Sequence, residues 1–212
     1  MTSLPQQHPQ LPTAKTGVLL VNLGTPNSLS YWDLRRYLDE FLSDKRVVEL
    51  PRLLWLPLLR GVLLNFIPFK SRRGYAPIWD YEKNESPLLT ITKNQTEALR
   101  NALSDDTSDL VVDFAMRYGT PSIKSAVHRM QQQGVNKLLV VPLYPQYSAV
   151  TTASVMDAVF AALKDLRWQP TLRTLHPYFD EEPYIDALAH SVTEDYKGLS
   201  WTPDVLLTSY HG

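Results

Sequence analysis

The 212-residue sequence contains no cysteine and only 8 glycines. Without cysteine, the chain forms no disulfide, holds no iron–sulfur cluster and offers no thiolate to a metal or a substrate. No two glycines stand two positions apart, so the G-x-G-x-x-G dinucleotide fingerprint is absent, as is the G-x-x-x-x-G-K-[ST] phosphate loop. These absences remove the usual sequence support for disulfide-stabilised, iron–sulfur, dinucleotide-binding and P-loop proteins.

The sequence also lacks an excess of charge of one sign, with 21 Lys and Arg residues against 22 Asp and Glu residues. A formal net charge of -1 gives no electrostatic support for nucleic acid as the main partner. A hydrophobic fraction of 44% is ample for a packed core, and the length fits one α/β domain or one domain with part of a second. Residues 1–16 are rich in proline and glutamine, and we expect a disordered tail there rather than a signal peptide.

Short apolar runs alternate with amphipathic patterns along most of the chain. The runs are continuous in apolar character rather than alternating, which is typical of parallel strands that are covered on both faces. The amphipathic patterns predict helices, several of which open with Ser or Thr as an N-cap. The alternation predicts an α/β fold with a doubly wound parallel sheet. We expect strands at 17–24, 110–116, 137–143, 171–175 and 205–208, and helices at 30–42, 92–103, 122–133, 154–166 and 182–196.

An insertion at 43–87 interrupts this alternation and contains no strand pattern. Its residues 53–67 form the most apolar segment of the chain, which we take as too short to span a bilayer. This segment is either a helix packed on the domain or an apolar lip beside a pocket or on a membrane surface. We expect a first α/β domain at 17–148, with the insertion inside it, and the beginning of a second, truncated α/β domain at 149–212.

Polar and aromatic residues follow several expected strands at their carboxyl ends, where parallel sheets bind ligands. We expect these endings to converge on one rim lined by Tyr, Arg, Gln and His. No G-x-S-x-G or H-E-x-x-H pattern occurs, which argues against a serine hydrolase or a zinc protease. Such a rim suits a flat, largely apolar ligand with anionic edges, because aromatic faces pack on it and Arg pairs with carboxylates. The endings are residues 22–26, 117–121, 144–148 and 209–212.

Five segments, in order from about Gly17 to the end, together resemble the ferrochelatase family. The Tyr-Pro-Gln-Tyr-Ser segment is the most specific of them. The resemblance implies insertion of ferrous iron into protoporphyrin IX, the last step of haem synthesis, in a cleft between two similar domains of chelatase-like, flavodoxin-like topology. The segments are Val-Asn-Leu-Gly-Thr-Pro at 21–26, Glu-Ser-Pro-Leu at 85–88, Met-Arg-Tyr-Gly at 116–119, Leu-Tyr-Pro-Gln-Tyr-Ser at 143–148 and Ser-Tyr-His-Gly at 209–212.

The resemblance also implies that His211 is the catalytic residue, as the iron ligand or as the acceptor of pyrrole N–H protons. Neutral imidazole suits both roles, because it binds Fe(II) and titrates near neutral pH. An ordinary histidine at a strand end is the structural alternative. The other residues that the resemblance places at the porphyrin site are Leu23, Arg117, Tyr118, Tyr144, Gln146, Tyr147, Arg72 and Arg73.

These porphyrin-site residues have structural alternatives too. Arg117 and Tyr118 could satisfy polar groups at a strand end, the residues at 144–147 could fix a turn, and Arg72 and Arg73 could belong to a solvated basic helix. We expect no cofactor beyond the substrate Fe(II), and a cytoplasmic protein with peripheral contact at the inner membrane.

Two further functional readings remain at this stage. The chain could be an inactive fragment that only binds porphyrin, because the later part of the family's sequence supplies an acidic residue facing the histidine. A related chelatase for cobalt or another tetrapyrrole fits less well with the Tyr-Pro-Gln-Tyr-Ser and Glu-Ser-Pro-Leu segments.

Overall fold

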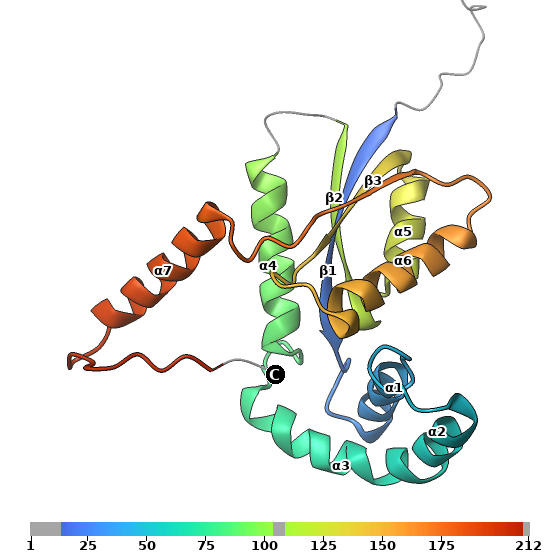
Figure 1. The fold of residues 1–212 in the computed structure, drawn as a ribbon, viewed down its shortest axis with the longest axis horizontal. Helices are drawn as coiled ribbons and strands as arrows, with labels where there is room; N and C mark the ends of the chain where they lie inside the picture. The colour runs from blue at the N-terminus through green and yellow to red at the C-terminus, as the bar shows by residue number, and fades with distance from the viewer. Residues whose placement is uncertain (1–13, 104–108, 210–212) are drawn as a thin grey trace, which may run out of the picture. The chain divides into compact units, whose positions relative to one another are not determined.

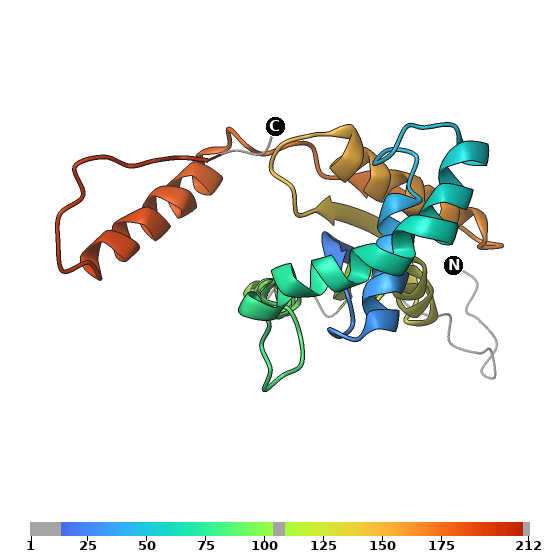
Figure 2. The same ribbon diagram turned by 90° about the horizontal axis from the view of Figure 1, so that it is seen from below.

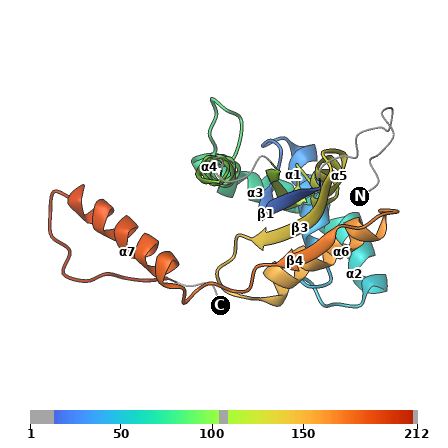
Figure 3. The same cartoon turned by 90° about the horizontal axis from the view of Figure 1, so that it is seen from above.

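A computed structural model describes residues 14–103 and 109–209 of the chain. Contacts divide the chain into two units, Met1–Leu175 and His176–Gly212. The first unit contains an all-parallel, four-stranded sheet in the order β2-β1-β3-β4, which confirms the predicted α/β fold (Figures 1 and 3). Its strands are β1 (Lys15–Thr25), β2 (Leu110–Gly119), β3 (Val135–Pro142) and β4 (Thr171–Thr174).

Helices cover both faces of this sheet, as expected for a doubly wound fold (Figure 1). On one face, buried residues of β1 such as Leu19 and Val21 pack against α5 (Ile123–Gln132) and α6 (Ser154–Lys164). On the other face, Val18 and Leu20 lie under α4 (Pro87–Ala102). Successive side chains of a strand point to opposite faces, so a continuously apolar β1 supplies both cores.

Side chains and glycine set the helix ends where the sequence indicates them. Ser30 caps α1 (Tyr31–Leu42) by accepting the backbone N–H of Asp33, and Ser122 caps α5 in the same way. Gly134 adopts a φ of 90° directly after α5, a conformation that favours glycine at a helix C-terminus.

The insertion folds into one bent helical rod. Its parts are α2 (Arg52–Leu58), the π-helical turn η1 (Leu59–Leu63), α3 (Leu64–Tyr75) and the 3-10 turn η2 (Ala76–Ile78). Figure 2 shows the rod from the side opposite the sheet. Irregular backbone in the rod is supported by two side chains of α1, one at the π-helical turn and one at Leu64, whose carbonyl lacks its usual helical donor because Pro68 has no N–H. Arg35 donates to the carbonyl of Arg60, and Tyr31 to that of Leu64.

The rod has a buried middle and exposed ends. Leu59 and Leu64 are 0% and 1% exposed and pack against Tyr37 of α1 and Tyr118 of β2. Leu53 at one end is 91% exposed, and Phe66 towards the other is 70% exposed. The rod is thus packed on the domain, as the first reading of the insertion expects, and it also presents exposed apolar side chains, whereas the reading as a lip beside a pocket or on a membrane stays a prediction.

Three details of the structure differ from the sequence expectations. Helix α4 begins at Pro87 rather than near residue 92, because Ser86 caps it and proline fits the first helical position. The apolar run in the insertion belongs to a continuous helix of 27 residues, Arg52–Ile78, which by length and composition alone could cross a membrane. The reading of this segment as too short for a bilayer is therefore wrong, although its buried middle ties it to the domain core.

Residues 205–208 are the third difference, because they form no strand. A strand needs a neighbour to pair its backbone groups, and the described part of the second unit contains α7 (Glu182–Lys197) and no strand. Helix α7 is amphipathic, and within its unit Ile185, Leu188 and Val192 stay substantially exposed. The first unit takes in α6 and β4, and the predicted domain boundary at residue 148 stays a prediction.

Candidate functional site

The neighbouring strands β1 and β2 both end in Gly-Thr-Pro, at Gly24 and Gly119, and their backbones approach closely there. Both glycines adopt positive φ values, of 110° and 89°. A Cβ on Gly24 would lie 1.8 Å from the carbonyl oxygen of Tyr118, and one on Gly119 would lie 2.6 Å from that of Thr25. Only glycine fits either position, so the repeated tripeptide lets the two strand ends meet.

Helix α1 satisfies backbone groups at this junction. The Tyr37 hydroxyl donates to the Gly24 carbonyl over 3.4 Å, and a carboxylate oxygen of Glu40 accepts the Gly119 N–H over 2.8 Å. These contacts hold α1, and the insertion that follows it, against the carboxyl ends of β1 and β2.

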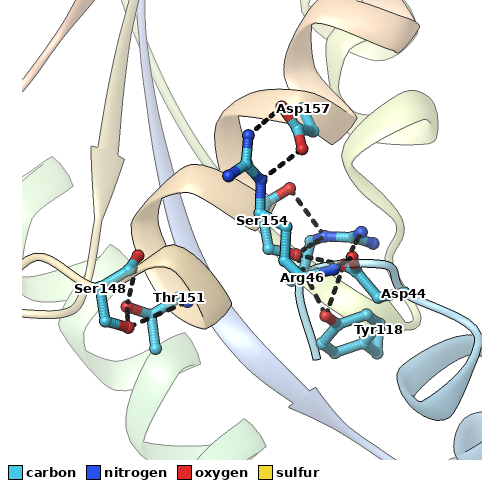
Figure 4. A network of polar contacts seen from close by, with 8 residues as sticks. Asp44, Arg46, Tyr118, Ser148, Thr151, Ser154 and Asp157 are labelled. Carbon is cyan, nitrogen blue, oxygen red and sulfur yellow. Dashed lines mark hydrogen bonds and ion pairs between the residues drawn. The ribbon is translucent and has the colours of Figure 1, made fainter. Parts of the chain in front are cut away.

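Asp44, two residues after α1, lies at the centre of a polar cluster (Figure 4). Its Oδ2 accepts hydrogen bonds from the Arg117 guanidinium at 2.5 Å, from the Tyr118 hydroxyl at 2.8 Å and from the Ser154 hydroxyl. Its Oδ1 accepts the backbone N–H of Arg46 at 2.8 Å. Arg117 Nε also donates to the hydroxyl and the carbonyl of Ser154, at 2.7 and 2.9 Å. We call Asp44, Arg117, Tyr118 and Ser154 the Asp44 cluster.

A second ion pair, nearer the solvent, joins the segment after α1 to helix α6. Arg46 binds Asp157 of α6 through two nitrogens, with N–O distances of 2.5 and 3.1 Å (Figure 4). Both side chains are well exposed, at 38% and 52%. An open depression of about 510 Å³ lies beside this pair, with Lys45, Glu49 and Arg52 among its lining residues.

Burial and hydrogen bonding oppose each other in the pKa of Asp44. Burial alone raises the pKa, but bonds from Ser154, the Arg46 backbone and Tyr118, with the charge of Arg117, lower it below the usual value. Burial raises the pKa of Tyr118 to about 12. Burial, with Tyr118 nearby, also raises the pKa of Tyr144, whose hydroxyl is buried without a hydrogen-bond partner. Asp44 is thus the anion of the cluster and both tyrosines stay protonated.

Four of the residues expected at the porphyrin site lie in this region. Leu23 packs against the apolar cluster that contains Tyr118. Arg117 is in the Asp44 cluster, with its guanidinium 4.4 Å from the centre of the Tyr118 ring. Tyr144 follows β3 and is close enough to Tyr118 and Arg117 for both to affect its pKa.

The remaining expected site residues are less constrained. Gln146 and Tyr147 are exposed on the loop after β3, and Ser148 caps the π-helical turn η3 (Ala149–Ala153) that leads into α6. Arg72 and Arg73 are exposed in the last turn of α3, and no contact joins them to the Asp44 cluster. His211 lies outside the described residues. Among those that are described, no three His, Asp or Glu residues are grouped so that they could hold a metal ion.

Sequence reasoning missed Asp44 and Ser154. Asp44 stands 73, 74 and 110 positions from Arg117, Tyr118 and Ser154, so no local pattern links them. The one signal in the sequence is that Asp44 is an acidic residue at the beginning of the insertion, two residues after an amphipathic helix.

Comparison with known proteins identifies the family. The family model described as Ferrochelatase matches residues 15–212. The chain belongs to the ferrochelatase family. It is 51% identical over 212 residues to a ferrochelatase of Agrobacterium fabrum, with 100% of this chain and 61% of the relative covered. It is 53% identical over 209 residues to one of Allorhizobium ampelinum, with 99% and 60% covered. It is 54% identical over 205 residues to one of Brucella ovis, with 97% and 58% covered.

The match to the ferrochelatase family confirms the resemblance drawn from the five sequence segments. The chain spans about three fifths of the length of these curated relatives. The Gly-Thr-Pro strand ends, the Asp44 cluster and the Tyr-Pro-Gln-Tyr-Ser loop all lie within the region that the family model matches.

Proposed function

We propose that the chain carries the first part of a ferrochelatase, which inserts Fe(II) into protoporphyrin IX in haem biosynthesis. The observation that carries this proposal is the family match over residues 15–212. The arrangement of β1, β2 and β3 supports it, because their carboxyl ends bring Leu23, Tyr118 and Tyr144 into one region, where parallel sheets bind ligands.

The proposed chemistry exchanges two pyrrole protons for one metal ion. The porphyrin loses both N–H protons, and the four nitrogens then bind Fe(II), so charge and atoms balance. In this proposal His211 accepts a pyrrole proton or delivers the iron, both of which neutral imidazole can do. Binding that bends the macrocycle exposes nitrogen lone pairs to the metal and would favour the transition state.

The proposed porphyrin contacts come from three segments of the chain. Leu23, which is only partly buried, offers an apolar contact, whereas Tyr118 is fully buried and supports the site from within. The exposed Gln146 and Tyr147 belong to the loop that follows β3. Arg72 and Arg73 are the cations proposed to hold the propionates, since both are exposed on α3 and a guanidinium pairs well with carboxylates.

We also propose a cytoplasmic protein that contacts the membrane peripherally through the outer surface of the rod. Leu53 and Phe66 on that surface are 91% and 70% exposed, whereas Leu59 and Leu64 anchor the rod to the domain. A rod held on the domain in this way would lie on a bilayer with its exposed apolar side chains rather than cross it.

A second candidate function is porphyrin binding without turnover. It is favoured by the coverage of the relatives, of which the chain matches 61% or less in the three cases compared. In that case the first-domain contacts would hold porphyrin, and turnover would need groups outside the part of the relatives that the chain matches.

An anaerobic insertion assay separates these functions. Protoporphyrin is incubated with Fe(II) or Zn(II) and the 212-residue chain, and the metalloporphyrin is followed by absorbance. We expect turnover that His211→Ala abolishes and His190→Ala, an exposed histidine of α7, leaves intact. Porphyrin binding without turnover would favour the second candidate. Full turnover by His211→Ala would contradict the role assigned to His211, and no binding at all would contradict both functions for this chain.

A further inference from the structure

The Asp44 carboxylate uses both of its oxygens within the protein. Oδ2 accepts three donors and Oδ1 accepts a fourth, and the side chain is only 8% exposed. A carboxylate so enclosed, with four donors already bound, is poorly placed to accept a hydrogen bond from a substrate. Its role must therefore be exerted through the groups that it binds.

Two of the donors to Asp44 also bind each other, because Arg117 donates to both Ser154 oxygens. The Tyr118 and Ser154 hydroxyls, each of which donates its proton to Asp44, lie 3.1 Å apart. Tyr118 and Ser154 are fully buried, and Arg117 is 19% exposed. Moving one member of such a closed network would leave a buried charge or hydroxyl without a partner, which is strongly unfavourable.

This network joins three segments that are far apart in the sequence. Asp44 begins the insertion that leads to Arg72 and Arg73, Arg117 and Tyr118 end β2, and Ser154 begins α6. Ser154 directly follows η3, which the loop bearing Tyr144 and Tyr147 enters. Each segment that carries a proposed porphyrin contact, apart from β1, is thus tied to one carboxylate.

We propose that Asp44 is a positioning residue of the porphyrin site. It fixes the beginning of the insertion and the start of α6 against the carboxyl end of β2. In this way it sets the spacing of the side chains that would hold the macrocycle. This inference rests on the proposed function for its ligand, whereas the mechanical coupling of the segments rests on geometry alone.

The test compares Asp44→Asn and Ser154→Ala with Asp113→Asn. Asp113 is a good control because it also pairs with an arginine, Arg129, but near the other end of β2. Ser154→Ala removes one donor and no charge, so it still reports on the cluster if Asp44→Asn does not fold. Circular dichroism establishes that each variant is folded before it is used.

Two readouts are taken on the 212-residue chain. The first is amide hydrogen exchange of residues 43–48 and 149–156. The second is the affinity for protoporphyrin IX, from the change in its fluorescence on titration. We expect Asp44→Asn to speed exchange in both segments and to weaken binding by about tenfold. We expect Ser154→Ala to act in the same direction by less, and Asp113→Asn to leave both readouts within about twofold of the original chain.

Each outcome has a distinct meaning. Unchanged exchange in the cluster variants would overturn the coupling, and equal loss of affinity in Asp113→Asn would show a general stability effect rather than positioning. Faster exchange with unchanged affinity would separate the cluster from the porphyrin site and overturn its assignment to that site. If the original chain binds no protoporphyrin, the proposed function fails instead, and the exchange data still decide whether Asp44 couples the segments.

Discussion

Strand β2 carries an ion pair towards each of its ends, and the two pairs connect different amounts of the chain. Near its amino end, Asp113 binds Arg129 of α5 at 2.8 and 3.2 Å, and the pair joins one strand to one helix. At its carboxyl end, Arg117 binds Asp44 in a cluster that joins the strand, the insertion and α6. In the first pair, the Arg129 and Asp113 side chains are 43% and 20% exposed. In the second pair, the Arg117 and Asp44 side chains are 19% and 8% exposed.

The difference shows where this fold uses buried charge. A cross-link between a strand and the helix beside it can be supplied by apolar packing alone, so the Asp113 pair adds little that the core does not already provide. Three segments from distant parts of the sequence need a directional contact to align them, and hydrogen bonds to a buried carboxylate are directional. The carboxyl end of the sheet is thus specified by polar geometry and the amino end by packing.

The largest effect should come from the backbone at the carboxyl end. Gly24→Ala or Gly119→Ala would place a Cβ against a carbonyl oxygen at a positive φ. We expect either change to destabilise the fold by about 3–5 kcal/mol in urea unfolding. Gly74→Ala in α3 is the matched control, because no atom lies within 4 Å of its added Cβ. It should stabilise by about 0.5–1 kcal/mol. Equal behaviour of the three variants would refute the close approach of the two strands.

The next effect compares the two ion pairs directly. Asp44→Asn leaves Arg117 buried without its counter-charge, and we expect a loss of about 3 kcal/mol in the free energy of unfolding. Asp113→Asn should lose about 1 kcal/mol, because Arg129 is more exposed and can turn to solvent. Urea denaturation at neutral pH measures both. A larger loss for Asp113→Asn would reverse the comparison between the two ends of β2.

The dependence of stability on pH tests the contribution of the Asp44 carboxylate to the free energy of unfolding. Its native pKa lies below its usual value, so its contribution to stability is complete above the unfolded pKa of about 3.9 and is lost as the pH falls further. The free energy of unfolding should therefore fall more steeply below about pH 5 in the original chain than in Asp44→Asn. Asp33 and Glu85, whose pKa values are also lowered, should preserve part of the slope in the variant. Parallel curves would contradict the depressed pKa.

The smallest effect belongs to the exposed pair at the root of the insertion. Asp157→Asn removes the partner of Arg46, and both side chains are in contact with solvent. We expect Asp157→Asn to shift the unfolding midpoint by less than Asp113→Asn does. The shift caused by Asp157→Asn should disappear at about 1 M salt, because exposed charges are screened. A salt-independent loss as large as that of Asp44→Asn would mean that the second link is as important as the first.

Local patterns in the sequence predict much of this structure. Strands β1, β2 and β3 follow from largely apolar runs, and the starts of α1 and α5 from serine N-caps. Strand β4 has one apolar residue, Leu172, and its signal is weaker. The amphipathic pattern predicts a start of α4 that is too late, because the Ser86-Pro87 start signal lies outside that pattern. Residues 205–208 have the composition of a strand, but composition cannot supply the neighbour that a strand requires.

The candidate site is only partly predictable for a related reason. Strand-end residues such as Arg117 and Tyr118 can be found, because topology places the carboxyl ends of parallel strands together. Their hydrogen-bond partners Asp44 and Ser154 cannot be found, because that pairing depends on how a long insertion folds back onto the sheet. Resemblance to a family points to residues in its conserved segments and says nothing about the contacts that hold them in place.

The exposed apolar side chains of the rod have a consequence for the substitutions that the chain can tolerate. Leu59 and Leu64 cannot become polar without damaging the core, since both are fully buried. Leu53, Leu54 and Phe66 carry no such constraint, because most of each side chain faces solvent. Polar residues at these positions should leave the fold intact and raise solubility. A loss of function in such variants, with stability unchanged, would therefore report on a contact that the chain makes outside its own fold.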